Sequence, residues 1–119
     1  MKEGRYRFIK HMVGHEAKRS GYHVYVLIED RFYNFYLPKG LPQKRSDSRL
    51  VLDVSSCCSP EVFYDLEYKE GKLLEEGEAE MELDGRGIKL SLGGAEYRFI
   101  PREKDRYLCL LRATNRRRR

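Results

Sequence analysis

The chain has 119 residues, of which 40% are hydrophobic and 36% are charged, and its 24 Lys and Arg against 19 Asp and Glu give a formal net charge of +5. This length suits one domain with one core, and the nine Tyr, five Phe and many aliphatic residues exclude a disordered chain. No apolar run approaches the roughly 18 residues of a membrane-spanning helix, so we expect no membrane association.

Apolar and polar residues alternate with a period of two along most of the chain, and β-branched and aromatic residues fill the apolar positions. This pattern predicts strands, separated by turns rich in Gly, Pro, Asp and Ser. In chain order the predicted strands cover residues 6–12, 22–28, 31–37, 49–54, 62–68, 78–83, 88–92, 96–100 and 107–112. The only helical turn is predicted at residues 72–76.

The strand at residues 22–28 has the clearest alternation, with His23 and Tyr25 on one face. The opposite face carries Tyr22, Val24, Val26 and Ile28. A slip of one residue would turn the apolar face to water, so the register of this strand is well determined. Short strands without intervening helices predict an all-β fold, a small antiparallel β-barrel with little helix. We expect one domain over residues 1–114 and a basic tail over 115–119.

The tail contributes four of the positive charges, so the rest of the chain carries only +1. These four residues are Arg116, Arg117, Arg118 and Arg119. Such a run either keeps a protein soluble or adds sequence-independent affinity for phosphate backbones, and both readings stay open.

The cysteines and the N-terminus indicate a cytoplasmic protein. Cys57, Cys58 and Cys109 form no C-x-x-C pair, and the first ten residues lack the apolar stretch of a secretory signal. Reduced thiols are therefore expected.

Three histidines, His11, His15 and His23, lie close together in the sequence. Each has an ordinary reading as a surface or hydrogen-bonded side chain. If the face of His23 lines the barrel mouth, however, His15 and Cys57 can approach it. Two histidines and a cysteine are acceptable ligands for zinc or a similar ion, so these three residues form the candidate metal set.

Three segments of the chain resemble a known family. They are HEAKRSGYHVY at residues 15–25, LPKG at 37–40 and SRLVLDV at 48–54. They are similar to the N-terminal 3′-phosphoesterase domain of bacterial and archaeal DNA ligase D, whose pattern reads roughly H-D-A-R-R-L-H-Y-D-L-R-L-E, W-A-V-P-K-G and K-R-L-A-V-x-V-E-D-H-P. The correspondence from His15 through Cys57 needs no gap. The resemblance implies a small β-barrel and manganese-dependent trimming of 3′-phosphates and 3′-ribonucleotides at DNA ends.

The resemblance preserves only part of the family's active site. His15 corresponds to a metal ligand, and Lys39 and Arg49 correspond to phosphate-binding cations. The remaining positions differ: the second metal histidine falls on Gly21, the metal aspartate on His23, an arginine on Tyr25 and a phosphate-contacting histidine on Cys57. These changes remove ligands that Mn²⁺ favours and a bidentate donor that a phenol cannot replace.

Three functions follow from this pattern. The favoured one is a diverged, monomeric member of the family that binds DNA or RNA 3′ ends, or a repair ligase or polymerase, without the ancestral chemistry. The alternative is an active phosphoesterase with a rebuilt site for Mn²⁺ or Zn²⁺ at His15, His23 and Cys57. The third is a β-barrel scaffold whose tail serves solubility. For the first two, His15, His23, Lys39, Arg49 and Cys57 are expected to converge at one mouth of the barrel.

Overall fold

The computed structural model describes residues 2–11, 21–57, 71–85 and 87–114. Within these ranges the only helical element is the 3₁₀ turn η1 (Ser55–Cys57). It is too short to be a helix that crosses a membrane. The strands are β1 (Lys2–His11), β2 (Gly21–Ile28), β3 (Arg31–Leu37), β4 (Ser48–Asp53), β5 (Gly71–Asp84), β6 (Gly87–Leu92), β7 (Ala95–Glu103) and β8 (Arg106–Thr114).

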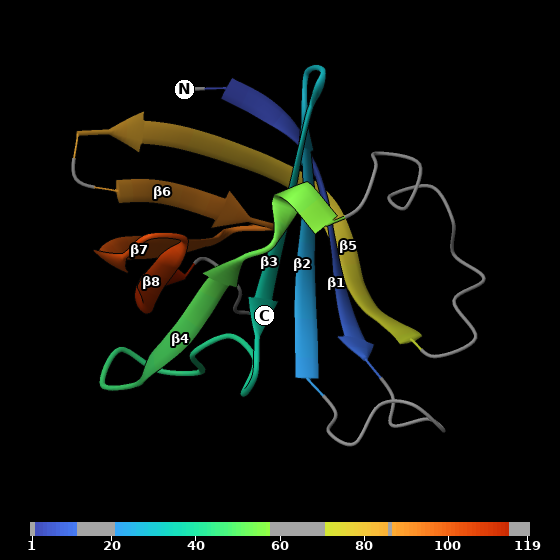
Figure 1. Cartoon of the computed structure of the whole chain (residues 1–119). Coiled ribbons are helices and arrows are strands. Elements are labelled where there is room, and N and C mark those ends of the chain that lie inside the picture. The colour runs from blue at the N-terminus through green and yellow to red at the C-terminus, as the bar shows by residue number, and fades with distance from the viewer. Residues whose placement is uncertain (1, 12–20, 58–70, 86, 115–119) are drawn as a thin grey trace.

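The strands form a closed barrel in the order β1-β2-β3-β4-β8-β7-β6-β5, and every neighbouring pair is antiparallel (Figure 1). β1 closes it by pairing with β2 along one edge and with β5 along the other. The predicted all-β fold, a small antiparallel β-barrel with little helix, is confirmed.

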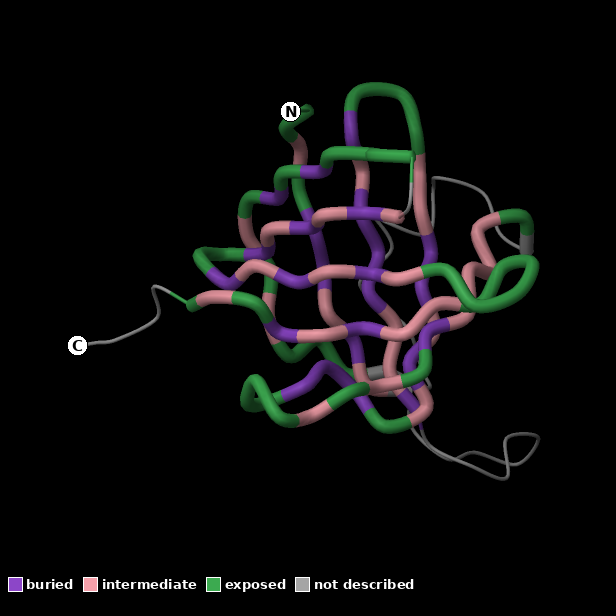
Figure 2. Tube along the Cα trace, turned by 90° about the vertical axis from the view of Figure 1, so that its left-hand side faces the viewer, coloured by how far each residue is buried: buried purple, intermediate pink, exposed green. Residues whose placement is uncertain are grey.

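The barrel interior is filled with apolar side chains, as the alternation along β2 predicted. Val24 and Val26 are fully buried in the core and Ile28 is 3% exposed, while Tyr22 packs against the same cluster. Buried residues alternate with more exposed ones along most of the strands in Figure 2. His23 and Tyr25 therefore project from the outer face of the wall.

The barrel has two ends that differ in their connections. The hairpin end carries the β2–β3 turn at Glu29 and Asp30, together with the β5–β6 and β7–β8 turns. The loop end carries the segment at residues 38–47, the β6–β7 turn and Thr114, from which the chain enters residues 115–119. The register Ser48↔Leu110 places the start of β4 beside the last part of β8 at this loop end.

The helical turn predicted at residues 72–76 is wrong, because these residues belong to the 14-residue strand β5. The run KLLEE has good helix formers, but pairing with β1 overrides that local preference. The pairs Phe8↔Glu75 and Ile9↔Leu73 leave a register shift between them, as in a β-bulge. The strand predicted at residues 62–68 lies outside the described residues.

The wall is thinnest between β3 and β4, which pair only at Phe35↔Asp53 and Tyr36↔Leu52. Toward the hairpin end, η1 takes the place of further pairing: the Val54 N–H donates to the Asn34 carbonyl at 2.9 Å. Toward the loop end the two strands diverge (Figure 1).

Candidate nucleic-acid interface

Four aromatic rings follow one another on the outer face of β2 and β3, and we call them the outer aromatic row: Tyr36, His23, Tyr25 and Phe32. Their successive ring centroids lie 5.1, 5.8 and 5.6 Å apart, with tilted planes. These separations fall in the range of attractive aromatic pairs. The row begins at Tyr36, one residue from the loop-end limit of β3, and runs toward the hairpin end.

His23 is held in one orientation by a chain of hydrogen bonds. Its Nδ1 lies 2.8 Å from Oδ1 of Asn34, and because an amide oxygen only accepts, Nδ1 carries the proton. The neutral ring then has its lone pair on Nε2. Asn34 is itself fixed, since its N–H donates to Ser55 Oγ at 2.9 Å, and that hydroxyl donates to Asp53 at 2.5 Å. The imidazole is thus positioned from β3 and η1.

Gly21 lies directly beside the first ring of the row. A Cβ at Gly21 would lie 2.5 Å from both Cε1 and Oη of Tyr36, well inside normal contact. The Tyr36 ring therefore occupies the space that a side chain at position 21 would need. This is the position that corresponds to a metal histidine in the resembled family, and no histidine fits there unless the ring moves.

Arg49 lies on β4, where the strand has diverged from β3. It pairs with Cys109, a fully buried core residue, so its side chain points to the inner side of the barrel wall. Its guanidinium reaches Asp47 at 3.5 Å and the Ser48 carbonyl at 3.1 Å. Its Nε is buried and has no hydrogen-bond partner in the described structure. Nε itself is out of an anion's reach, but the side chain is 26% exposed and the two contacts use only part of its five N–H donors, so its outer N–H groups can reach an anion.

The loop end is basic. Lys39, Lys44 and Arg45 are exposed along the 38–47 segment, Arg112 is exposed near the end of β8, and Asp47 is the acidic residue of that segment. Leu41 and Pro42 line the same 380 Å³ hollow as Leu111 and Thr114, so the basic segment adjoins the point where the tail begins.

The structure describes the side chains of only three of the predicted site residues, His23, Lys39 and Arg49. His15, the Cys57 side chain and the tail arginines 116–119 lie outside the described residues. His23 and Arg49 project from opposite faces of the wall, so they do not converge at one mouth, and the face of His23 is the outer wall. Lys39 is exposed two residues beyond β3. Among the described residues no three His, Cys, Asp or Glu side chains are grouped to hold a metal.

Three residues near the row escaped the sequence analysis. Arg7 is 8% exposed, faces its β2 partner Tyr25 and makes a 3.1 Å ion pair with Glu76. Asn34 and Tyr36 share the outer face of β3 with Phe32. The alternation in RFYNFYL at residues 31–37 could have identified Asn34 and Tyr36, because pairing β2 with β3 as a hairpin places these two residues opposite Tyr25 and His23 on β2.

Two titratable groups have raised pKa values. Burial in the core raises the pKa of the Cys109 thiol far beyond its usual range, although Arg49 opposes the shift. This thiol is therefore inert at neutral pH. Partial burial raises the pKa of Tyr107, and the negative charges of Asp53 and Asp105 raise it further.

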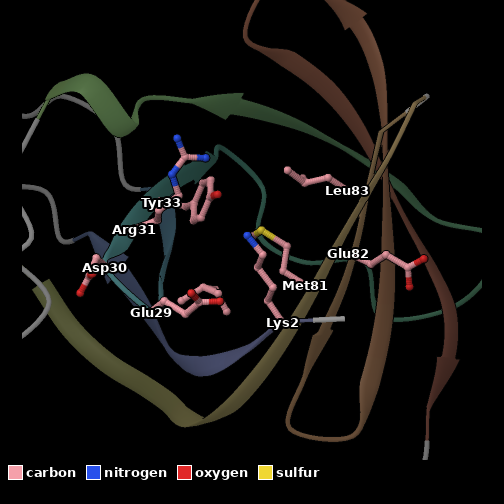
Figure 3. Close-up of a pocket in the computed structure, with 9 residues that line it drawn as sticks. Lys2, Glu29, Asp30, Arg31, Tyr33, Met81, Glu82 and Leu83 are labelled. Atoms are coloured by element: carbon pink, nitrogen blue, oxygen red, sulfur yellow. The ribbon is translucent and has the colours of Figure 1, made fainter.

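The hairpin end contains a separate hollow of about 530 Å³ between β3 and β5 (Figure 3). Its walls include Tyr33, Met81 and Leu83, and the Lys2 ammonium and the Leu83 side chain extend into it. The acidic residues Glu29, Asp30 and Glu82 also belong to its lining.

The chain was compared with protein-family models and with curated proteins. No protein-family model matches the chain, and no curated protein matches it. Function is therefore inferred from the residues and the geometry above.

Proposed function

We propose that this chain is a diverged DNA ligase D 3′-phosphoesterase-like domain that binds nucleic-acid 3′ ends, as a cytoplasmic monomer, without the metal-dependent chemistry of that family. The observation that carries the proposal is the loop-end half of the outer aromatic row, the partly exposed rings of Tyr36 and His23, which precede the basic 38–47 segment. Proteins that hold single strands combine a cationic track for the backbone with aromatic rings on which bases stack. Both parts occur here on adjoining surfaces.

The cations have separable roles in this proposal. Lys39, Lys44 and Arg45 attract the phosphate backbone without reading sequence, as does the tail. Arg49 holds a phosphate through the guanidinium donors that the protein leaves unused. Tyr36 and His23 receive the bases nearest the end.

The position of Tyr36 supports the absence of ancestral chemistry. Phosphoryl transfer depends on metal ions and placed cations to stabilise the developing charge. The ring fills the place of one ligand beside Gly21, and His23 puts a neutral imidazole where the family has a carboxylate. A phosphate can still bind, since a guanidinium and ammonium groups need no metal for that.

The test is fluorescence anisotropy with a labelled primer–template that ends in a 3′-phosphate, a 3′-ribonucleotide or a 3′-hydroxyl. Tyr36→Ala is expected to weaken binding about tenfold, because stacking contributes roughly 1–3 kcal/mol per base. Lys44→Ala should reduce the salt dependence, whereas the control Lys104→Ala, an exposed lysine at the hairpin end, should not. Equal binding by wild type and Tyr36→Ala would refute the proposed surface.

The second candidate is an active enzyme with a metal at His15, His23 and Cys57. The observation that favours it is the Nδ1–H of His23 bound to Asn34, the arrangement that commonly orients metal-ligating histidines. Metal analysis of the purified protein and a trimming assay with and without Mn²⁺ separate the two. We expect no Mn²⁺-dependent release of 3′-phosphate; release that disappears in His23→Ala would favour the enzyme.

A further inference from the structure

The hollow at the hairpin end continues into a second one of about 360 Å³, and the two share Arg31, Tyr33 and Leu83. Because they share these residues, we treat them as one elongated surface and call it the hairpin-end groove. It runs from Lys2 on β1 across to Tyr107 on β8. A groove of this length suits an extended segment better than a compact ligand.

The groove has an apolar floor with one exposed anchor. Leu83 is 60% exposed and lies between the two hollows, whereas Ile28 and Met81 beside it are 3% and 4% exposed. Tyr33 and Tyr107 add aromatic surface, and aromatic and large apolar side chains dominate the centres of protein interfaces. Leu83 is the most exposed of the four large hydrophobic side chains that are exposed in the described part of the chain.

Acidic side chains outnumber basic ones around this floor. Five acidic residues belong to the groove or its rim, Glu29, Asp30, Asp53, Glu82 and Asp84, against the two cations Lys2 and Arg31. Asp84 is already paired with Arg98 at 2.7 Å, and without it the count is four acidic residues against two basic ones. Figure 3 shows the carboxylates of Asp30 and Glu82 directed outward, away from the hollow. Burial is the largest cause of the raised pKa of Tyr107, and the negative charges of Asp53 and Asp105 raise it further, which agrees with a negative potential at this end of the groove.

The turn that forms one rim also has a strained backbone. Glu29 has a φ of +54°, a region that L residues other than Gly, Asn and Asp enter at a cost. Such strain tends to persist at binding sites. It is a second feature of the groove, independent of charge.

We infer that the hairpin-end groove docks a basic peptide segment of another protein, in which a large apolar residue is flanked by Lys or Arg. The apolar residue packs on Leu83 and Tyr33, and the flanking cations meet Asp30, Glu82 and Asp53 at the rim. Lys2 and Arg31 donate to backbone carbonyls of the segment. This site lies at the opposite end of the barrel from the basic loop end, so it does not depend on the proposed nucleic-acid function.

The test uses a fluorescein-labelled ten-residue peptide with a central Leu-Phe pair between lysines. A second peptide carries Glu in place of every Lys, and a third carries Ser in place of Leu-Phe. We expect the first peptide to bind the intact chain, with an affinity that falls as salt rises, and the other two to bind at least about fivefold more weakly.

Two pairs of variants locate the site. Leu83→Ser should weaken the first peptide about fivefold or more, whereas Leu50→Ser, 45% exposed on β4 outside the groove, should not. Glu82→Lys should weaken it in the same way and Glu78→Lys, also on β5 but outside the groove, should not. Thermal melts confirm that each variant is folded.

Three results would overturn the inference. They are binding of the acidic peptide as tight as that of the basic one, an equal response of Leu83→Ser and Leu50→Ser, and concentration-dependent dimerisation of the chain that Leu83→Ser abolishes. The last result would assign the groove to a second copy of this chain.

Discussion

Gly21 has no room for a side chain, so a single methyl group there tests the packing of the outer aromatic row. In Gly21→Ala the new Cβ would start 2.5 Å from Cε1 and Oη of Tyr36. Ordinary contacts between such atoms are about 3.5–4.0 Å, so the ring must move by about 1 Å or more. Overpacking of a core typically costs about 1–3 kcal/mol, but here the clashing atoms are the far end of a half-buried ring that can swing aside. We expect a loss of about 1 kcal/mol in the free energy of unfolding.

The same displacement should also affect binding. Tyr36 is the ring next to His23, with centroids 5.1 Å apart, and moving it breaks the continuity of the row. The affinity for the 3′-phosphate primer–template should therefore fall in Gly21→Ala by an amount close to that of Tyr36→Ala.

Urea denaturation and a double-mutant cycle measure the effect. In the Tyr36→Ala background the methyl group has space, so Gly21→Ala should then cost less than about 0.5 kcal/mol. Gly85→Ala is the matched control, because a Cβ there has no heavy atom within 4 Å. The reasoning fails if Gly21→Ala is no more destabilising than Gly85→Ala, or if its cost persists without the Tyr36 ring.

Three further outcomes are expected. Glu29→Gly should raise the free energy of unfolding by about 1 kcal/mol, measured by urea denaturation, because glycine adopts the φ of +54° without strain; a destabilised variant would contradict this. The phenol of Tyr107 should titrate above its ordinary pKa of 10.0 in ultraviolet absorbance. Since the folded state holds this proton more tightly, the unfolding free energy should fall as pH rises above 10, and it should fall by less in Tyr107→Phe. In Asp53→Asn the pKa of the phenol should be lower than in the wild type. Identical alkaline melts of wild type and Tyr107→Phe would count against this explanation. Deletion of residues 116–119 should leave the melting temperature unchanged and weaken nucleic-acid binding at low salt without altering any end preference; unchanged affinity at low salt would exclude the tail from binding.

The sequence predicted which residues share a face of a strand better than it predicted how exposed that face is in the barrel. Alternation along β2 separates Val24 and Val26 from His23 and Tyr25, because side-chain direction follows from local backbone geometry. It also predicts that the apolar set lies inside, but it does not reveal how far the outer set is covered: Tyr25 is only 4% exposed although it projects from the outer wall. The placement of His23 at a mouth was therefore open to error.

Contacts between distant segments could not be read from the sequence for a related reason. The pairing of β4 with β8 joins residues about 60 positions apart, and only the closed barrel requires it. Likewise, helix propensity favoured a turn at residues 72–76, but the edge of β1 pairs with residues 71–81 of β5. The anchoring of His23 by Asn34 depends on the β2–β3 register and on η1 together.

The proposed loss of chemistry and the proposed gain of a binding surface are two consequences of one arrangement. In the resembled family a metal histidine stands at the position of Gly21, and the outer aromatic row needs the Tyr36 ring in that same space. The two therefore exclude each other as long as Tyr36 stays in place. Arg49 is not part of this conflict, because its side chain projects from the opposite face of the wall and is 26% exposed, so its outer guanidinium N–H groups can reach an anion. Phosphate binding can thus survive the change that removes the metal ligand, which is why we propose an end-binding domain in place of an enzyme.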